Sequence, residues 1–263
     1  MRHAILICLL LSFVDIGAGQ ETPPPLVLPT VTTPVKQVQT FALPDPLTVS
    51  TLMKALVQTR NGRYEPMQVV QATIMKGASV VSLLKQILFV DSASAKVVTD
   101  PEPGDTLQSP GVVGDHDVSA YIIASLEGIA TQACYDMLMQ AAASHPNPGV
   151  RGSSLIALGN SYHDRVSSDA LKPNPEIVHL LLKCADDKES VLSRKKSIGE
   201  IARSGLLTWT GMDLGESIGD PPTILVGKTK TQMSIGEYRE YWWSTQSSKL
   251  TWNKEDGRFT VRQ

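Results

Sequence analysis

The side chains in this sequence that could carry out chemistry are spread along the chain and do not form a recognisable catalytic set. The tightest group of metal-ligating types is Asp115-His116-Asp117, in which two carboxylates flank an imidazole and could chelate a cation. The same three residues suit the start of a helix, because Asp117 as N-cap would accept backbone N–H groups. We favour the helix start and predict no metal site.

The sequence lacks the motifs of well-known catalytic sites. It contains no nucleophile elbow, P-loop, Rossmann glycine fingerprint or HExxH sequence. His163-Asp164 lies where a helix is expected to end, and a histidine there can interact with the terminal carbonyl groups. We therefore predict a protein that is not an enzyme and needs no cofactor.

Cys134 and Cys184 both lie among apolar residues in helical patterns, and neither belongs to a CxxC pair or a zinc-binding pattern. In an exported protein a disulfide between them is allowed. The other interpretation is two separate buried thiols that act as small hydrophobic side chains. We favour the separate thiols, and the disulfide stays open.

Residues 1–19 have the order of a secretory signal peptide, with a short polar start, the apolar run Ala4–Val14 and small residues up to Gly19. The apolar run is shorter than the roughly 20 residues that a membrane-spanning helix needs. Residues 20–46 follow as a proline-rich, disordered linker, in which neither a helix nor a central strand can persist. We predict an exported protein, periplasmic or secreted, with no transmembrane segment after signal removal.

The composition is that of a folded chain, since 42% of the residues are hydrophobic and 19% are charged. The formal net charge at pH 7 is −2 and the pI is about 6.2. A protein that tracks phosphate groups carries a large basic excess or a basic face. We therefore expect no nucleic-acid partner.

The elements that position these residues are predicted to be helices from residue 47 onward, because the apolar spacing there has a helical period. The first helical stretches cover 48–60, with Thr48 or Ser50 as cap, 65–75 and 80–90. Residues 91–116 lack periodicity and carry several prolines and glycines, which predicts a loop inserted between helix pairs.

A repeated pattern of apolar and small residues fills the next part of the chain. It recurs three times, over Val118–Glu127, Val150–Gly159 and Ser190–Gly199. Repeats of about 20–50 residues with helical content indicate stacked helix pairs. Further helical stretches, 133–144 and 177–185, precede the second and third copies as first helices of such pairs. The second copy carries the small residues Ser154, Ala157 and Gly159. We expect these small residues to let this helix pack closely against the long Leu and Met side chains of its partner helix.

The sequence NPGVRGSSLIALGNS, which begins at Asn147, resembles the second helix of a HEAT repeat of the phycobilisome-lyase type, and YDMLMQAAASHPNP before it resembles the first helix and turn. The resemblance is good over 117–162 and looser over 175–205. It implies a short α-solenoid of antiparallel helix pairs over 47–205, used mainly to bind other proteins. It also implies that Arg151 is structural and ties one repeat to the next.

Residues 206–263 leave the repeat pattern and form a Trp-rich extension. Trp209-Thr210-Gly211 is expected to lie in a loop, and Ser234 to Glu237 reads as a capping box that opens a helix. Two β-prone runs around Asp256-Gly257 predict a hairpin. We expect this helix and hairpin to cap the open end of the solenoid, with three tryptophans as the capping side chains: Trp242, Trp243 and Trp252.

The function that these features favour is a non-catalytic scaffold for an unidentified protein partner. Candidate binding residues on the helix faces are Tyr121, Arg151, Tyr162 and Arg194, the last within the short basic run Arg194-Lys195-Lys196. The alternative is a ligand-binding or lyase-like HEAT protein that holds a small molecule in its groove. It requires Tyr121, Arg151, Tyr162 and His163 to converge on one pocket.

Overall fold

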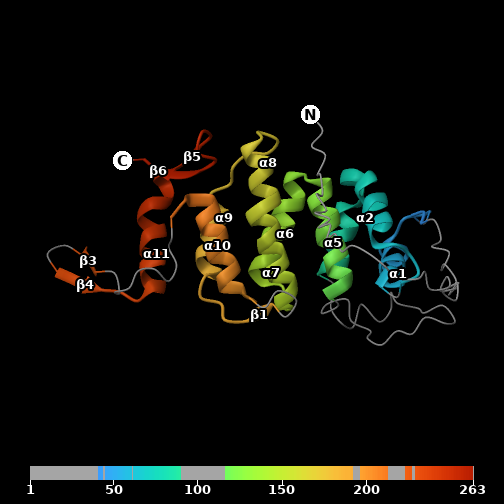
Figure 1. The fold of residues 1–263 in the computed structure, drawn as a ribbon, viewed down its shortest axis with the longest axis horizontal. Helices are drawn as coiled ribbons and strands as arrows, with labels where there is room; N and C mark the ends of the chain where they lie inside the picture. The colour runs from blue at the N-terminus through green and yellow to red at the C-terminus, as the bar shows by residue number, and fades with distance from the viewer. Residues whose placement is uncertain are drawn as a thin grey trace, which may run out of the picture. The chain divides into compact units, whose positions relative to one another are not determined.

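The computed structural model describes residues 41–43, 45–60, 62–89, 116–191, 196–212, 223–226 and 229–262. In these ranges the chain is mainly helical, with short two-stranded antiparallel sheets (Figure 1). The mainly helical class predicted from the sequence is therefore confirmed. The predicted signal peptide, nearly all of the predicted loop over 91–116, and Arg194 lie outside the described residues, as do the side chains of Asp115-His116-Asp117.

The first helices lie where the periodicity predicts them. They are α1 (Val49–Arg60), α2 (Pro66–Met75) and α3 (Val81–Leu88), the last preceded by the 3₁₀ turn η1 (Gly77–Val80). The hydroxyl of Thr48 accepts the backbone N–H of Thr51 at 3.1 Å, so Thr48 is the capping residue.

The folded part begins before residue 47. The Phe41 ring packs edge-on against Tyr64, with 5.0 Å between ring centroids, and Leu43 also lies against the hydrophobic core. The end of the segment predicted as a linker is therefore part of the packed structure, because burying these two side chains removes apolar surface from water.

The central helices share the hydrophobic core. They are α5 (His116–Ile129), α6 (Gln132–Ser144) and α7 (Pro148–Ala157), followed without a break by a π-helical turn, η2 (Leu158–Tyr162), and by α8 (His163–Ser167). Helix α6 packs along α7, and α5 lies beside both α7 and α2. The stretches that begin at Val118 and Val150 are thus neighbouring helices.

The next pair is α9 (Glu176–Cys184) and α10 (Ile198–Thr210), which pack on each other, while α10 also packs on α7. The prediction that the third repeat copy is helical from Ser190 is wrong. Ser190–Val191 (β1) instead pairs with Lys196–Ser197 (β2), and the helix starts only at Ile198. The reason is local, because Ser197 and Glu200 form a capping box that fixes the start of α10.

The C-terminal extension contains strands β3 (Thr223–Val226) and β4 (Thr229–Gln232), helix α11 (Ile235–Gln246), the 3₁₀ turn η3 (Ser247–Lys249) and strands β5 (Leu250–Asn253) and β6 (Arg258–Val261). The predicted capping box is confirmed at the start of α11, and β5 and β6 form the predicted hairpin.

The prediction of a loop at Trp209-Thr210-Gly211 is wrong for its first two residues. Trp209 and Thr210 end α10, and Gly211 terminates the helix with a positive φ of 66°, a conformation that glycine adopts without steric cost. The helix continues because Leu206 and Trp209 are both buried on the same face as the earlier core residues of α10.

Close backbone approach between α10 and its neighbours depends on glycines. A Cβ built on Gly159 would lie 3.7 Å from the Cα of Gly205, so η2 and α10 touch through backbone atoms. The small residue Gly159 therefore faces another helix backbone instead of the long side chains expected from the sequence. A Cβ on Gly199 would meet the Ala185 carbonyl oxygen at 2.6 Å, so this position has no room for a side chain.

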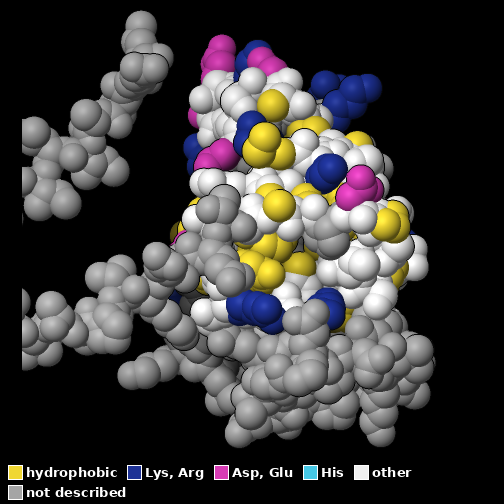
Figure 2. Space-filling model, turned by 90° about the vertical axis from the view of Figure 1, so that its right-hand side faces the viewer, with side chains coloured by type: hydrophobic (Ala, Val, Ile, Leu, Met, Phe, Trp, Pro, Cys, Tyr) yellow, Lys and Arg dark blue, Asp and Glu magenta, His cyan; other side chains and the backbone are white. Residues whose placement is uncertain are grey.

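In the ranges that the structure covers, no single helix is long and apolar enough to cross a membrane; only α2 together with the segment Gly77–Leu88, bent by 109° against it, reaches the required length and apolarity. Figure 2 faces the α1–α2 end and shows hydrophobic side chains gathered among polar ones. On α2, Met67 and Met75 are 57% and 88% exposed.

Candidate functional site

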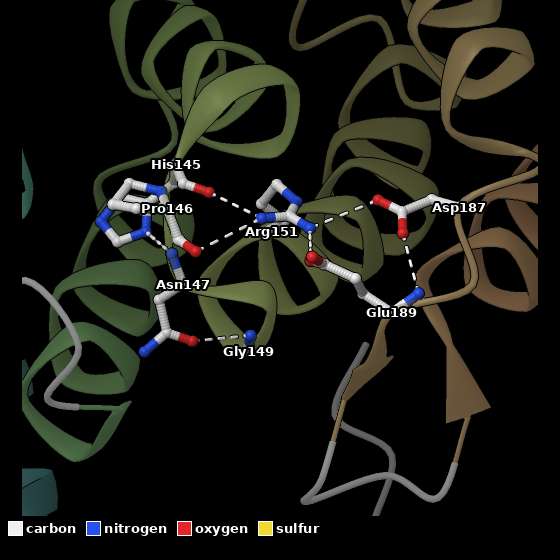
Figure 3. Close-up of polar contacts among 7 residues, drawn as sticks. All are labelled: His145, Pro146, Asn147, Gly149, Arg151, Asp187 and Glu189. Carbon is white, nitrogen blue, oxygen red and sulfur yellow. Dashed lines mark hydrogen bonds and ion pairs between the residues drawn. The ribbon is translucent and has the colours of Figure 1, made fainter.

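Arg151 joins two helix pairs through the turns at their ends. Its guanidinium donates to the His145 carbonyl at 2.9 Å in the α6–α7 turn, and it pairs with Asp187 at 3.3 Å and with Glu189 in the segment after α9 (Figure 3). Asp187 in turn accepts the backbone N–H of Glu189. The planar fork of arginine suits such a bridge because several N–H groups can point to different acceptors at once.

His145 ties the same turn to the preceding helices. The Asn147 backbone N–H donates to Nδ1, so Nε2 carries the proton and donates to the Leu88 carbonyl at 3.0 Å. That carbonyl ends α3 and would otherwise lack an intrahelical partner. His145 is 1% exposed, and burial lowers the pKa of its imidazole below the usual value.

The C-terminal helix α11 is attached to α9 and to the residues directly after it by two side-chain contacts. Arg239, 3% exposed, pairs with Asp186 at 2.5 Å, and Trp243 stacks on His179 with 4.5 Å between ring centroids. Trp242 is 8% exposed and belongs to the core. Trp243 thus packs on α9 and Trp242 belongs to the core, while their role as caps of a solenoid stays a prediction.

A second aromatic cluster is centred on Trp209, which is fully buried. Its indole N–H donates to the Leu158 carbonyl at 3.1 Å, where α7 passes into the π-helical turn. The rings of Tyr162, His163, Trp252 and Phe259 surround it. Because Trp252 and Phe259 lie on β5 and β6, the cluster fastens the C-terminal hairpin to the helices.

The predicted binding residues do not converge on one site. Tyr162 is buried and donates its hydroxyl to the Lys172 carbonyl, while His163 bonds the Gly257 carbonyl in the hairpin. Arg151 belongs to the turn described above, and Tyr121 lies partly buried on α5. Tyr162 and His163 thus share the Trp209 cluster, whereas Arg151 belongs to the bridge between the turns.

Both cysteines are free thiols, so the disulfide that the sequence left open is not formed. Cys134 is buried in α6, and Cys184 ends α9 partly buried. Burial, with a smaller contribution from Asp187, raises the pKa of the Cys184 thiol to about 11. A thiol that stays protonated at neutral pH is a poor nucleophile and a poor metal ligand. No group of three or more metal-ligating side chains occurs within the described ranges.

A groove of about 370 Å³ lies between α7 with its π-helical turn and α10. Its floor is formed by buried residues from both helices: Leu155, Gly159, Ile201 and Gly205. A Cβ on Gly159 would lie 3.7 Å from the Cα of Gly205, and a Cβ on Gly205 would meet the Leu181 side chain of α9 at 2.9 Å. The two glycines therefore allow the helices to approach closely beneath the groove.

Polar and apolar side chains form the rim of this α7–α10 groove. They are Ile156, Asn160, Lys196, Ser204 and Thr208, all partly or fully exposed. The Thr208 hydroxyl donates to the Ser204 carbonyl within α10. The side chains of Asn160, Lys196 and Ser204 make no hydrogen bond or ion pair with any described residue, so their donors and acceptors are available to a ligand.

An apolar floor with a few unengaged polar groups is the usual make-up of a binding site. Asn160 lies on the π-helical turn, and such turns are frequent at functional sites. Sequence reasoning missed the groove, although two signals point toward it. They are the exposed Asn160 inside a run of buried residues and the spacing of Ile201, Ser204, Gly205 and Thr208, which places these four on one face of α10.

Comparison of the chain with protein-family models, with curated proteins and with solved structures finds no significant match. Function is therefore inferred from the geometry of the chain itself.

Proposed function

We propose that this chain is an exported, HEAT-like repeat protein that binds another protein and performs no catalysis. The α7–α10 groove carries the proposal, because it lies between the second helices of two successive pairs and offers an apolar floor with free polar groups at its rim.

The arrangement of the helices supports a short solenoid. Helices α6–α7 and α9–α10 are pairs joined by connections that face each other across the Arg151 bridge, and the second helices α5, α7 and α10 lie next to one another in that order. Helix pairs that contact mainly their neighbours are the building principle of solenoids. The Arg151 bridge is also what the resemblance to HEAT repeats implies for this arginine.

The small-molecule alternative is less well supported. It requires Tyr121, Arg151, Tyr162 and His163 to meet in one pocket, and none of these residues lines the groove. Tyr162 is fully buried, and burial raises the pKa of its hydroxyl, so it presents no ionised group to a ligand at neutral pH.

The test is site-specific photocrosslinking in the organism's envelope or secreted fraction. A photoreactive phenylalanine analogue replaces Ser204 in the groove, and in a matched variant it replaces Gln140, which is exposed on α6 outside the groove. We expect one protein adduct from position 204 that is missing from position 140. Equal labelling at both positions, or none at position 204, would refute the groove as a protein-binding site.

A further inference from the structure

Lys196 places a single charge beside the α7–α10 groove. It lies on β2, two residues before α10 begins, is exposed, and lines the groove together with Ile201 and Leu155. Within the described ranges its ammonium group forms no salt bridge, although it adds a small contribution to the lowered pKa of Glu200, which comes mainly from hydrogen bonds with Ser197. The groove thus brings a cation next to an apolar floor.

The acidic residues of this region have hydrogen-bond or ion-pair partners other than Lys196. Glu200 accepts the backbone N–H and the hydroxyl of Ser197 in the α10 capping box. Asp187 and Glu189 are bound to Arg151. None of the residues that line the groove is acidic. Lys196 is also preceded directly in the sequence by Arg194 and Lys195, so the chain concentrates positive charge at this point.

We propose that the groove takes an acidic segment of the partner protein, with an aliphatic side chain on the floor and an Asp or Glu carboxylate at Lys196. This inference rests on the proposed binding function and names the chemistry of its partner. The aliphatic side chain contacts Leu155 and Ile201, and the backbone of the bound segment meets the amide of Asn160 and the hydroxyl of Ser204, which supply both donors and acceptors.

The experiment is selection of peptides from a randomised display library on the immobilised full chain. We expect enriched peptides to carry Asp or Glu near a Leu, Ile or Val. Lys196→Glu is expected to lower their binding at least tenfold, whereas Lys196→Arg, which keeps the charge, leaves it within about twofold. Binding is also expected to weaken as salt is raised, because the ion pair is exposed. Lys196 is exposed, so both variants are expected to melt at the wild-type temperature.

Ser204→Trp serves as the groove control, because a bulky neutral side chain at this exposed rim position would fill the groove without adding charge or disturbing the core. If the peptides that Ser204→Trp excludes are neutral or basic, or if they bind Lys196→Glu as well as the wild type, the acidic-segment inference is overturned and the binding function stands. If no selected peptide is sensitive to Ser204→Trp, the groove is not a binding site.

Discussion

Replacing Arg151 by methionine tests whether the bridge between the turns holds the helix pairs together. Methionine keeps much of the aliphatic packing, and Arg151 is only 14% exposed, so the change mainly removes the guanidinium. The neighbouring Asp187 and Glu189 then lose their counter-charge, and the His145 carbonyl loses its donor.

The magnitude follows from the three contacts. The bond to the His145 carbonyl comes from a charged group and contributes about 1.5 kcal/mol. The pair with Asp187, whose side chain is 28% exposed, contributes about 0.5–1 kcal/mol, and the pair with Glu189, 57% exposed, a few tenths. Together they predict a loss of roughly 2–3 kcal/mol in the free energy of unfolding.

Thermal unfolding followed by circular dichroism measures this loss. For a domain of this size 1 kcal/mol corresponds to roughly 2–4 °C, so Tm should fall by about 4–12 °C. Arg151→Lys should recover less than half of the loss, because an ammonium group cannot bridge the same acceptors. Lys183→Met is the matched control, since Lys183 is exposed on α9 and is expected to leave Tm unchanged.

A double-mutant cycle with Asp187→Asn shows whether the effect belongs to the bridge. Two residues in direct contact should show a coupling of about 0.5 kcal/mol or more. If Arg151→Met melts like Lys183→Met, or if the two substitutions are additive, the bridge between the turns does not hold the helix pairs together.

Three further predictions concern a buried histidine, two glycines at close helix contacts and a buried thiol. Because burial lowers the pKa of His145, the unfolded chain binds more protons than the folded chain just below the ordinary histidine pKa. The free energy of unfolding should therefore fall as pH drops below about 6.5, by at most about 1.4 kcal/mol per pH unit. In His145→Gln the urea midpoint should depend less on pH between pH 5 and 7 than it does in the wild type. Gly199→Ala should cost about 1–3 kcal/mol, because its Cβ would meet two backbone carbonyl oxygens, whereas Gly159→Ala, which finds only ordinary contacts, should cost less than half as much in the same melts. Cys184, with a pKa of about 11, should react with iodoacetamide at pH 7.5 more than tenfold more slowly than a thiol in a short peptide. Mass spectrometry can follow this rate. If Cys184 reacts as fast as the peptide thiol, the thiol is not buried as the structure shows.

The helices could be predicted from the sequence because their signals are local. The period of apolar residues located α1, α6 and α9, and the Ser-x-x-Glu pattern located the start of α11. The same pattern at Ser197 and Glu200 marks the start of α10, but similarity to the other repeat copies favoured an earlier start. A local hydrogen-bonding signal was in this case a better guide to the helix boundary than the repeat pattern.

The groove could not be predicted in the same way, because it arises from a pairing of distant segments. Asn160 lies on the π-helical turn that follows α7, and Gly159 approaches the backbone of Gly205 on α10, 46 residues along the chain. Neither the turn nor the pairing leaves a period in the sequence. The predicted binding residues were aromatic and basic side chains, which the fold uses instead for packing and for the bridge.

The Arg151 bridge and the α7–α10 groove share the same two helices, so stability and binding should be linked. Arg151 lies on the first turns of α7, and the Asp187–Glu189 segment that it holds leads into β1, β2 and the start of α10, where Lys196 lies. Gly199 bonds the Asp187 carbonyl through its own N–H at 2.8 Å, which fixes α10 to that segment. A ligand that spans α7 and α10 binds only when the helices are correctly spaced, and it stabilises that state by RT ln(1 + [L]/Kd). Loss of the bridge should therefore weaken binding although Arg151 does not line the groove, and a bound partner should restore part of the stability that the Arg151→Met protein loses.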